Sequence, residues 1–488
     1  MEIPRALLGA ILFAISPINV ESVAWIAERK NTLSMFLTCA AVLFHLRSED
    51  GKGGYGVAVL LFLGALLSKT AVVMLPVVLL VLAWLRRGRI TKRDMLRAGP
   101  YFALSLALGL VTVWFQYHRA IAEVVVRDDS PGWRLATAGC ALWFYLAKAL
   151  FPFGLMFNYP RWDVRLWGAA AFLPGAALLL LLGLLALWKP RGRPILAGLA
   201  VYILLLLPML GLLNIFFMKY SLVSDHWQYH ATAALYAMVG AAAALVARRL
   251  HGVPRQAWMG LLVAVGIVLL VQSMTMAALY RREDRVWTDT LERNPRSWLA
   301  AAHLGMDDLT ASGRDPAKSA AALRYLQMAT ELAPDESEVY LDLGAAYQRA
   351  GRLEEALDAF GRAGRALHGT VNDRASARLD EAAVEVLRGH LDVAKRMVGE
   401  ALAMEPESAP GAQRMAAVLL RQGDTEGART WYRRAVQRDP SLGEARFILA
   451  RLDARDGDLR EAAEQIAALN GLSPDDAAVR EVVAQLAR

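Results

Sequence analysis

The pattern of hydrophobic positions divides the 488-residue chain near residue 280. Before this point long apolar runs recur, such as 166–188 and 258–280, and a helix that crosses a bilayer needs about 20 such residues. After it, apolar residues recur every three or four positions, which is typical of helices with one buried face. We therefore expect an all-α protein with a polytopic membrane domain at 1–280, a connector at 281–297 and a soluble superhelix at 298–488.

Charge follows the same division. Residues 281–488 contain 29 Lys and Arg against 35 Asp and Glu, whereas residues 1–280 contain 25 against 11. The basic excess of the first part gathers in loops at 86–97, 189–194 and 248–255, and basic loops mark the cytoplasmic side of a membrane. The net charge of +8 therefore reports membrane topology and does not indicate nucleic-acid binding.

These loops set the direction of the apolar segments. Residues 100–116, 195–213 and 258–280 then run outward, and the soluble part lies on the non-cytoplasmic side. Residues 135–151 (LATAGCALWFYLAKALF) would add an odd crossing, so we expect them to lie in the outer interface or to re-enter. The Ala-, Arg- and Leu-rich composition is typical of a GC-rich bacterium, which would make the membrane the inner membrane and the outer side periplasmic.

A charged stretch at 16–34 (SPINVESVAWIAERKNTLS) separates the first two apolar segments. It carries Glu21, Glu28, Arg29 and Lys30 together with an apolar stripe, which predicts an ordered helix lying at the membrane surface. Charged residues between membrane segments form either the wall of a site or a structural hairpin, and the stretch alone does not decide between them.

Lys69 interrupts a second apolar run, at 56–85. A lysine at the centre of a bilayer would cost a few kcal/mol, so we expect two short helices that meet at the surface with Lys69 in their turn. The side chain is then either an anchor that reaches the interface or a contact for a phosphate group.

The loop at 214–230 (NIFFMKYSLVSDHWQYH) gathers polar side chains beside two apolar helices. Asp225, His226 and Tyr229 lie at its end, and such density at the mouth of a helix favours a functional site. The spacing of Asp225 and the two histidines matches no known metal signature, so no metal site is predicted. Both cysteines lie in apolar segments, and neither indicates a disulfide.

The soluble part repeats itself every 34 residues, as the spacing of Pro406, Pro440 and Pro474 shows. This period resembles that of tetratricopeptide repeats (TPRs), in which two helices form each unit and neighbouring units share a core. We expect repeats at 298–336, 337–370, 375–408, 409–442 and 443–476, with a capping helix from Asp476. The matching structural positions are Tyr340, Leu343, Gly344, Tyr347, Ala356, Phe360 and Ala363 in the best copy, and Ala394, Ala428, Tyr432 and Ala462 in later copies.

Three blocks of the membrane part carry a further resemblance. Residues 17–34 are similar to the pattern H-P-x-x-x-E-x-V-A-x-x-x-x-R-x-x-x-L-S, residues 66–76 (LLSKTAVVMLP) to a second block, and residues 152–160 to a third that ends in Tyr159-Pro160. With the TPR tail, the chain resembles the transmembrane-and-TPR-repeat proteins, which are similar to GT-C-type glycosyltransferases.

The resemblance implies transfer of a sugar from a polyprenyl-phosphate donor to an acceptor on the outer face. In the animal relatives the sugar is mannose and the acceptor is a protein hydroxyl, so the chemistry is O-mannosylation. Glu21 and Arg29 would line the donor site and Lys69 would meet the lipid phosphate. Such a transfer needs a carboxylate that takes the acceptor's proton and cations that hold the leaving phosphate.

We add further candidates from the outer loops. Glu28 and Asp225 join Glu21 as catalytic candidates, while Lys30, His226 and Tyr229 join Arg29 and Lys69 as substrate-binding candidates. No cofactor is certain, and a divalent cation is left open. The partners that these assignments imply are the bilayer, the polyprenyl-phosphate sugar donor and a protein on the TPR array.

The sequence departs from the family pattern in places. Ser16 stands where the family has histidine, and Thr70 stands where eukaryotic relatives have an acidic residue. The family also has earlier membrane helices and a first outer loop with an acidic residue. Because Met1 almost adjoins the first block, we expect either an upstream segment or a member that lacks this loop.

The alternative to an enzyme is a membrane-anchored TPR scaffold for protein–protein interaction in the cell envelope. An absent catalytic loop favours the scaffold, whereas the polar outer loops favour the enzyme. A transporter or channel is disfavoured, since the sequence has no second, similar membrane half.

Overall fold

The computed structural model describes residues 3–188, 191–313, 315–471, 473–474 and 476–487, and in these residues every regular element is a helix. The first two residues of the basic loop at 189–194 lie outside them. Contacts divide the chain into two compact units, Met1–Ala300 and Ala301–Arg488, and each is described by itself.

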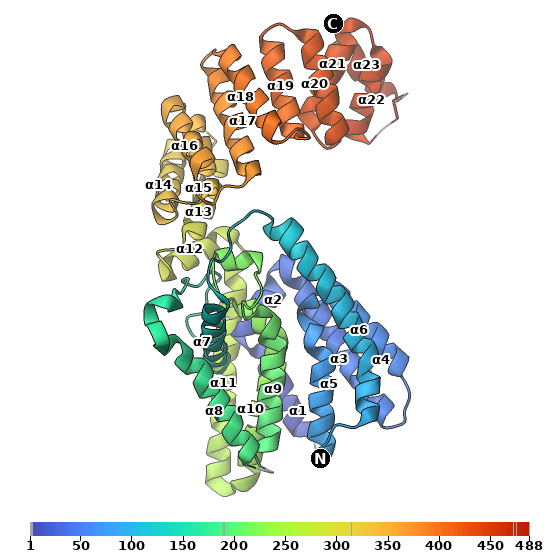
Figure 1. The fold of residues 1–488 in the computed structure, drawn as a ribbon, viewed down its shortest axis with the longest axis vertical. Coiled ribbons are helices and arrows are strands. Elements are labelled where there is room, and N and C mark those ends of the chain that lie inside the picture. The colour runs from blue at the N-terminus through green and yellow to red at the C-terminus, as the bar shows by residue number, and fades with distance from the viewer. Residues whose placement is uncertain (1–2, 189–190, 314, 472, 475, 488) are drawn as a thin grey trace. The chain divides into compact units, whose positions relative to one another are not determined.

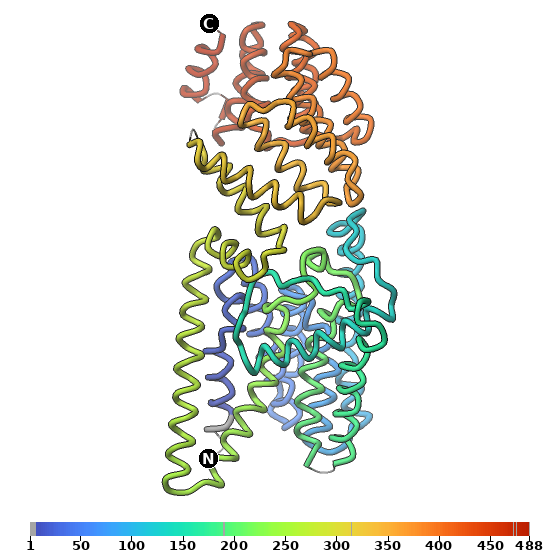
Figure 2. Tube along the Cα trace, turned by 90° about the vertical axis from the view of Figure 1, so that its left-hand side faces the viewer, coloured from blue at the N-terminus to red at the C-terminus, as the bar shows by residue number. Residues whose placement is uncertain are grey.

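The first unit is a bundle of helices that run alongside one another, joined at one end by irregular and 3₁₀ segments (Figures 1 and 2). Its helices are α1 (Ile3–Ile15), α2 (Val20–Ala24), α3 (Arg29–Glu49), α4 (Tyr55–Ser68), α5 (Leu75–Arg87), α6 (Lys92–Phe115), α7 (Pro131–Leu150), α8 (Leu173–Leu187), α9 (Gly192–Leu206), α10 (Tyr229–Arg249), α11 (Gly252–Leu279) and α12 (Glu283–Arg293).

Six helical segments in the described residues are long and apolar enough to cross a membrane. The helices α3 and α7 are not among the six, and Ala6–Ile15 with Pro17–Ala24 forms a further apolar pair bent by 59°. In α11 no residue is fully buried within the unit, and most of its apolar side chains are exposed, as those of a lipid-facing helix are. The six segments are Thr70–Arg87, Lys92–Ile121, Val164–Leu187, Gly192–Met209, Asp225–Arg249 and Gly252–Leu279.

The basic loops lie at one end of this bundle (Figure 1). The guanidinium of Arg193, at the start of α9, donates to the carbonyl of Trp84 at 2.7 Å, near the end of α5. Arg86 pairs with Glu49 of α3 at 3.0 Å. The charged stretch at 16–34, the turn at Lys69 and the loop at 214–230 lie at the opposite end.

The stretch at 16–34 is broken, so the prediction of one surface helix was wrong. It folds as a 3₁₀ turn (Pro17–Asn19), α2, a second 3₁₀ turn (Ile26–Glu28) and then α3. Pro17 lacks the N–H that a continuous helix would need, and Trp25 is extended, with φ −80° and ψ 115°. The breaks turn Glu21 and Glu28 into the unit, where both are buried.

The predicted interruption at Lys69 is present. Residue 69 is extended, with φ −159° and ψ 122°, between α4 and a 3₁₀ turn at Thr70–Met74. Pro76 lies in the first turn of α5, where its missing N–H removes no helical hydrogen bond.

The second unit stacks helix pairs (Figure 1). Its helices, of which the first begins in the preceding unit, are α13 (Trp298–Ser312), α14 (Pro316–Leu332), α15 (Ser337–Arg349), α16 (Leu353–Arg365), α17 (Val371–Leu387), α18 (Leu391–Met404), α19 (Ala409–Arg421), α20 (Thr425–Arg438), α21 (Gly443–Asp456), α22 (Leu459–Asn470) and α23 (Ala477–Leu486).

Two boundaries differ from the expected repeats. The longer loop predicted at 312–318 ends early, because Asp315 caps α14 by accepting from the N–H of Ala317 at 2.9 Å. The extra residues before the third repeat extend its first helix, since Thr370 and Asp373 form a capping box at the start of α17.

Small residues explain the 34-residue period. Gly351, Gly389, Gly423 and Gly457 follow the first helix of their repeats with φ between 74° and 89°, a conformation that other residues rarely adopt. Within the second repeat, a Cβ on Gly344 would lie 2.5 Å from Cε1 of Phe360, so only glycine lets the two helices cross this closely.

Candidate functional site

Four of the predicted site residues come together at one end of the first unit, although they lie on separate elements. Glu21 lies on α2, Glu28 on the following 3₁₀ turn, Lys69 between α4 and α5, and His226 on a 3₁₀ turn at Asp225–Gln228. The side chains of Glu21 and Glu28 are 2% and 5% exposed, so these carboxylates depend on protein partners rather than on water.

Glu21 holds the turn at 225–228. One carboxylate oxygen lies 2.8 Å from Nδ1 of His226, and the other accepts the backbone N–H of His226 at 3.1 Å. Ser224 Oγ lies 2.8 Å from the same ring nitrogen. Because both oxygens are engaged, the carboxylate orients the imidazole, and the pair can pass a proton between them.

Glu28 is the centre of a second ionic group. It pairs with Lys69 at 3.1 Å and with Lys30 at 3.0 Å, and it accepts a hydrogen bond from Asn31 Nδ2 at 2.7 Å. Burial opposes the ionisation of Glu28, but the charges of His226, Lys69 and Lys30 outweigh burial and lower the pKa of the carboxyl. Burial also lowers the pKa of the Lys69 ammonium, and Glu28 opposes that shift.

Asp225 is buried beside the first group. Both of its oxygens lie 3.0 Å from the hydroxyl of Tyr159, which donates to the carboxylate. Tyr159 ends the third family block but was not among the candidate site residues. The tyrosine–proline pair was the available signal, and nothing in the spacing linked it to Asp225.

The remaining candidates lie at the edge of this centre, where Lys30 reaches Glu28 from the surface. Arg29 and Lys30 are exposed at the start of α3. The ring of Tyr229 packs against Phe13 of α1, with centroids 5.2 Å apart, so it contributes to the packing between α1 and α10. The structure thus brings Glu21, Glu28, Lys69 and His226 together, with Asp225 buried beside them and Lys30 paired with Glu28 from the surface. It leaves Arg29 and Tyr229 at the margin.

Aromatic rings surround the imidazole of His226. The centroids of Trp25 and Phe217 lie 5.8 and 6.0 Å from it, and Phe157 lies 5.0 Å from Trp25. Trp287 of α12 packs on Phe157 at 5.0 Å, so the connector covers this side of the site. These rings could not be predicted as a group from the sequence, because they come from four separate segments.

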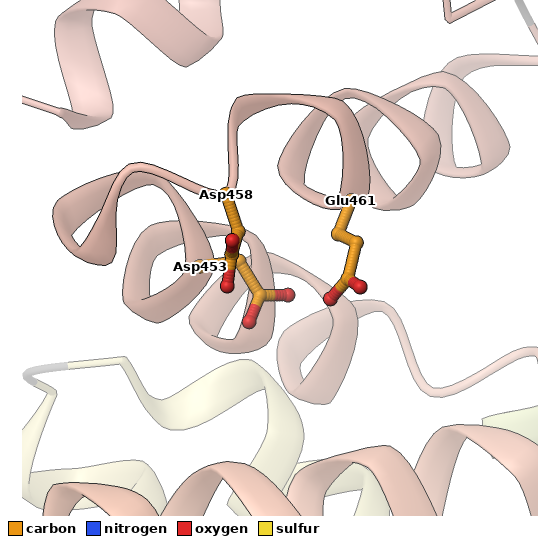
Figure 3. Close-up of side chains that lie close together, drawn as sticks. All are labelled: Asp453, Asp458 and Glu461. Carbon is orange, nitrogen blue, oxygen red and sulfur yellow. The ribbon is translucent and has the colours of Figure 1, made fainter.

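The second unit contains one acidic group, among the described residues, whose oxygens lie within 4.8 Å of one another: Asp453, Asp458 and Glu461 (Figure 3). Arg429 and Arg433 approach Asp453 Oδ1 at 3.2 and 3.3 Å. Burial raises the pKa of Asp453 to about 6, and the two guanidinium groups oppose this. Asp453 and Glu461 thus belong to an ion-pair network with Arg429 and Arg433.

Comparison with known proteins gives a family match within the second unit. A family model described as "Tetratricopeptide repeat" matches residues 419–486. The matched part of the array, residues 419–486, therefore consists of tetratricopeptide repeats. No curated protein matches the sequence.

Solved structures that are similar to this chain include three that are described as follows. PilW, a widely conserved type IV pilus biogenesis factor, is 18% identical, with a TM-score of 0.35 over 43% of this chain and 91% of its own. PilF of Pseudomonas aeruginosa is 20% identical, with a TM-score of 0.32 over 41% of this chain and 87% of its own. YrrB, described as a TPR protein with an unusual peptide-binding site, is 17% identical, with a TM-score of 0.28 over 41% of this chain and 97% of its own.

Proposed function

We propose that this protein is a membrane-anchored scaffold whose TPR array binds a protein partner. The array carries the proposal, since stacked helix pairs present an extended surface that suits a protein ligand. The surface of the array also retains exposed apolar side chains, such as Leu367, Leu387 and Phe447, which a partner would cover.

We place the first unit in the inner membrane of a bacterium, with the array on the periplasmic side. Two observations support the insertion of this unit in a membrane and its orientation there. Six of its segments have the length and composition of membrane spans. Its basic loops lie together at the end of the bundle opposite the site, as they would if that end faced the cytoplasm.

Site-specific crosslinking in living cells tests the scaffold. A photoreactive residue in place of Phe447, which is 43% exposed on the array, should crosslink one discrete protein partner. The same residue in place of Val263 on α11, which is 59% exposed, should crosslink only lipid, because we place α11 in the membrane. Protein crosslinks from α11 and none from the array would contradict the proposal.

Sugar transfer is a second candidate, and the buried centre favours it. A pure anchor has no need of Glu21 and Glu28, because burying charged groups costs stability unless they are well paired. Here Glu21 with His226 could take the proton of an acceptor hydroxyl, while Lys69 and the exposed Arg29 could hold the phosphate of a polyprenyl-phosphate sugar. This assignment combines the roles that the family resemblance implies with the geometry of the buried centre.

Glu21→Gln and Arg29→Ala test this candidate with membranes that contain the protein and radiolabelled polyprenyl-phosphate mannose. Transfer to protein should fall by about 100-fold or more, because the proton acceptor or the phosphate contact is lost. Glu49→Gln, at the opposite end of the bundle, should retain transfer. Crosslinking from position 447 should persist in all three variants, which separates the two functions. An active Glu21→Gln variant would remove this assignment.

A further inference from the structure

The negative charge of the array is concentrated in one segment. Residues 331–358 contain eight acidic residues and two basic residues, whereas the rest of residues 281–488 is balanced, with 27 of each sign. The segment runs from the end of α14 through α15 into α16. The whole charge excess of this half of the chain therefore lies within two consecutive repeats.

A groove of about 590 Å³ lies on this segment, between α14 and α16 and across α15. Its floor contains Tyr340, Leu343 and Tyr347, and Gln327 Nε2 donates to the hydroxyl of Tyr347 at 2.8 Å. Its rim carries the carboxylates Glu331, Glu354, Glu355 and Asp358 and the guanidinium of Arg362. The groove thus combines an aromatic floor with a mostly acidic rim.

Two of the rim carboxylates form ion pairs at the surface. Glu354 pairs with Arg388 at 3.1 Å and is 75% exposed, and Asp358 pairs with Arg362 at 2.9 Å and is 61% exposed. Exposed pairs of this kind contribute little to stability and are screened by salt. A cation from a partner can therefore replace the arginines with little loss of folding stability.

Arg352 is an example of a cation bound at the rim of this groove. The guanidinium of Arg352 lies over the ring of Tyr347, 4.6 Å from the centroid. It also donates to Glu355 at 2.9 Å. A positive charge at this rim is thus stabilised by an aromatic face and by a carboxylate at once.

We propose that the groove of α14, α15 and α16 binds a basic segment of a protein partner, with lysine or arginine side chains on the acidic rim and the segment's apolar atoms on the tyrosine floor. The proposal rests on the proposed role of the array in partner binding and names the chemistry of the partner. First helices of successive repeats contact one another, as α15 contacts α17 and α17 contacts α19. The groove lies instead between two second helices, and so on the other face of the array.

Binding of a labelled peptide to the full chain tests the site. The protein is placed in phosphatidylcholine nanodiscs, and fluorescence anisotropy follows a fluorescein-labelled peptide of alternating alanine and lysine. The unmodified protein should bind this peptide, and the double variant Glu354→Gln with Asp358→Asn should raise the Kd about tenfold. Binding should weaken as salt rises from low to physiological ionic strength, because the contacts are ionic.

A matched double variant controls for net charge. Glu407, in the turn before α19, pairs with Arg438 of α20, and Glu464 pairs with Arg460 within α22. Both glutamates are exposed, as Glu354 and Asp358 are in the groove. Glu407→Gln with Glu464→Gln should change the Kd less than about twofold. Three results would contradict the proposed site. The two double variants could weaken binding equally, a peptide of alternating alanine and glutamate could bind as well as the lysine peptide, or the lysine peptide could fail to bind.

The crosslinking experiment separates the two proposals. If a partner crosslinks at position 447 equally well in the unmodified protein and in the groove variant, the array remains a scaffold, but the groove is not the surface that binds the partner. Loss of that crosslink in the groove variant, with retention in the matched control, supports both.

Discussion

Replacement of Lys69 by methionine is expected to lower the free energy of unfolding of the first unit by about 3–5 kcal/mol. Methionine has a similar length and suits the apolar surroundings, so the loss comes from charge rather than from volume. Glu28 would keep only the exposed Lys30 as its cationic partner within 4.0 Å among the described residues. A buried carboxylate that loses its buried partner bears the cost of its own desolvation.

Unfolding in mixed micelles with increasing sodium dodecyl sulfate, followed by tryptophan fluorescence, measures this effect. Lys92→Met makes the same change at an exposed position at the start of α6 and should cost less than about 0.5 kcal/mol. Adding Glu28→Gln to Lys69→Met should restore part of the loss, because no unpaired charge then remains. A loss below about 1 kcal/mol for Lys69→Met would show that the pair does not stabilise the fold.

The repeat array could be predicted almost completely from the sequence, because its signals are local. A glycine that ends the first helix, an alanine where helices cross and a proline between repeats recur at fixed spacing, and each determines the backbone within a few residues. The errors fell at the first and third repeats, where capping residues lengthened helices beyond the average repeat.

The sequence predicted which residues form the buried centre only in part. Charged residues beside apolar helices singled out Glu21, Glu28, Lys69, Asp225 and His226, because charge near a membrane is costly and is kept for a reason. Their pairing could not be predicted. Glu21 and His226 are 205 residues apart, and no local pattern distinguishes that pair from any other acid and base on the same face.

The stretch at 16–34 shows where helical periodicity misleads. Its apolar positions fit one face of a helix, yet Val23 is 62% exposed and Ile26 is 71% exposed, while Ile18 is fully buried. The acidic side chains are buried instead, because the breaks at Pro17 and Trp25 let Glu21 and Glu28 turn inward to a cationic or imidazole partner. Tertiary ion pairs outweighed the local pattern, which is what a functional site would require.

Phe360→Ala is expected to have the largest effect in the array, a loss of about 3–5 kcal/mol in the free energy of unfolding of the second unit. The ring is 1% exposed in the core shared by α14, α15 and α16, next to Gly344. Gly344 has no side chain that could fill the space, so a cavity remains. Because the groove floor is built on the same core, crosslinking to a partner should fall with the folded fraction.

Phe447→Ala provides the control, since it removes the same ring in the same unit from a side chain that is 43% exposed. It should lower the free energy of unfolding, followed by circular dichroism, by less than about 1 kcal/mol.

The two variants also test whether the two units act independently. If partner binding and sugar transfer reside in different units, Phe360→Ala should reduce crosslinking in proportion to the unfolded fraction, while transfer by the first unit to a small soluble acceptor continues. Loss of both activities together would mean that the array is part of the catalytic machinery and not only a scaffold.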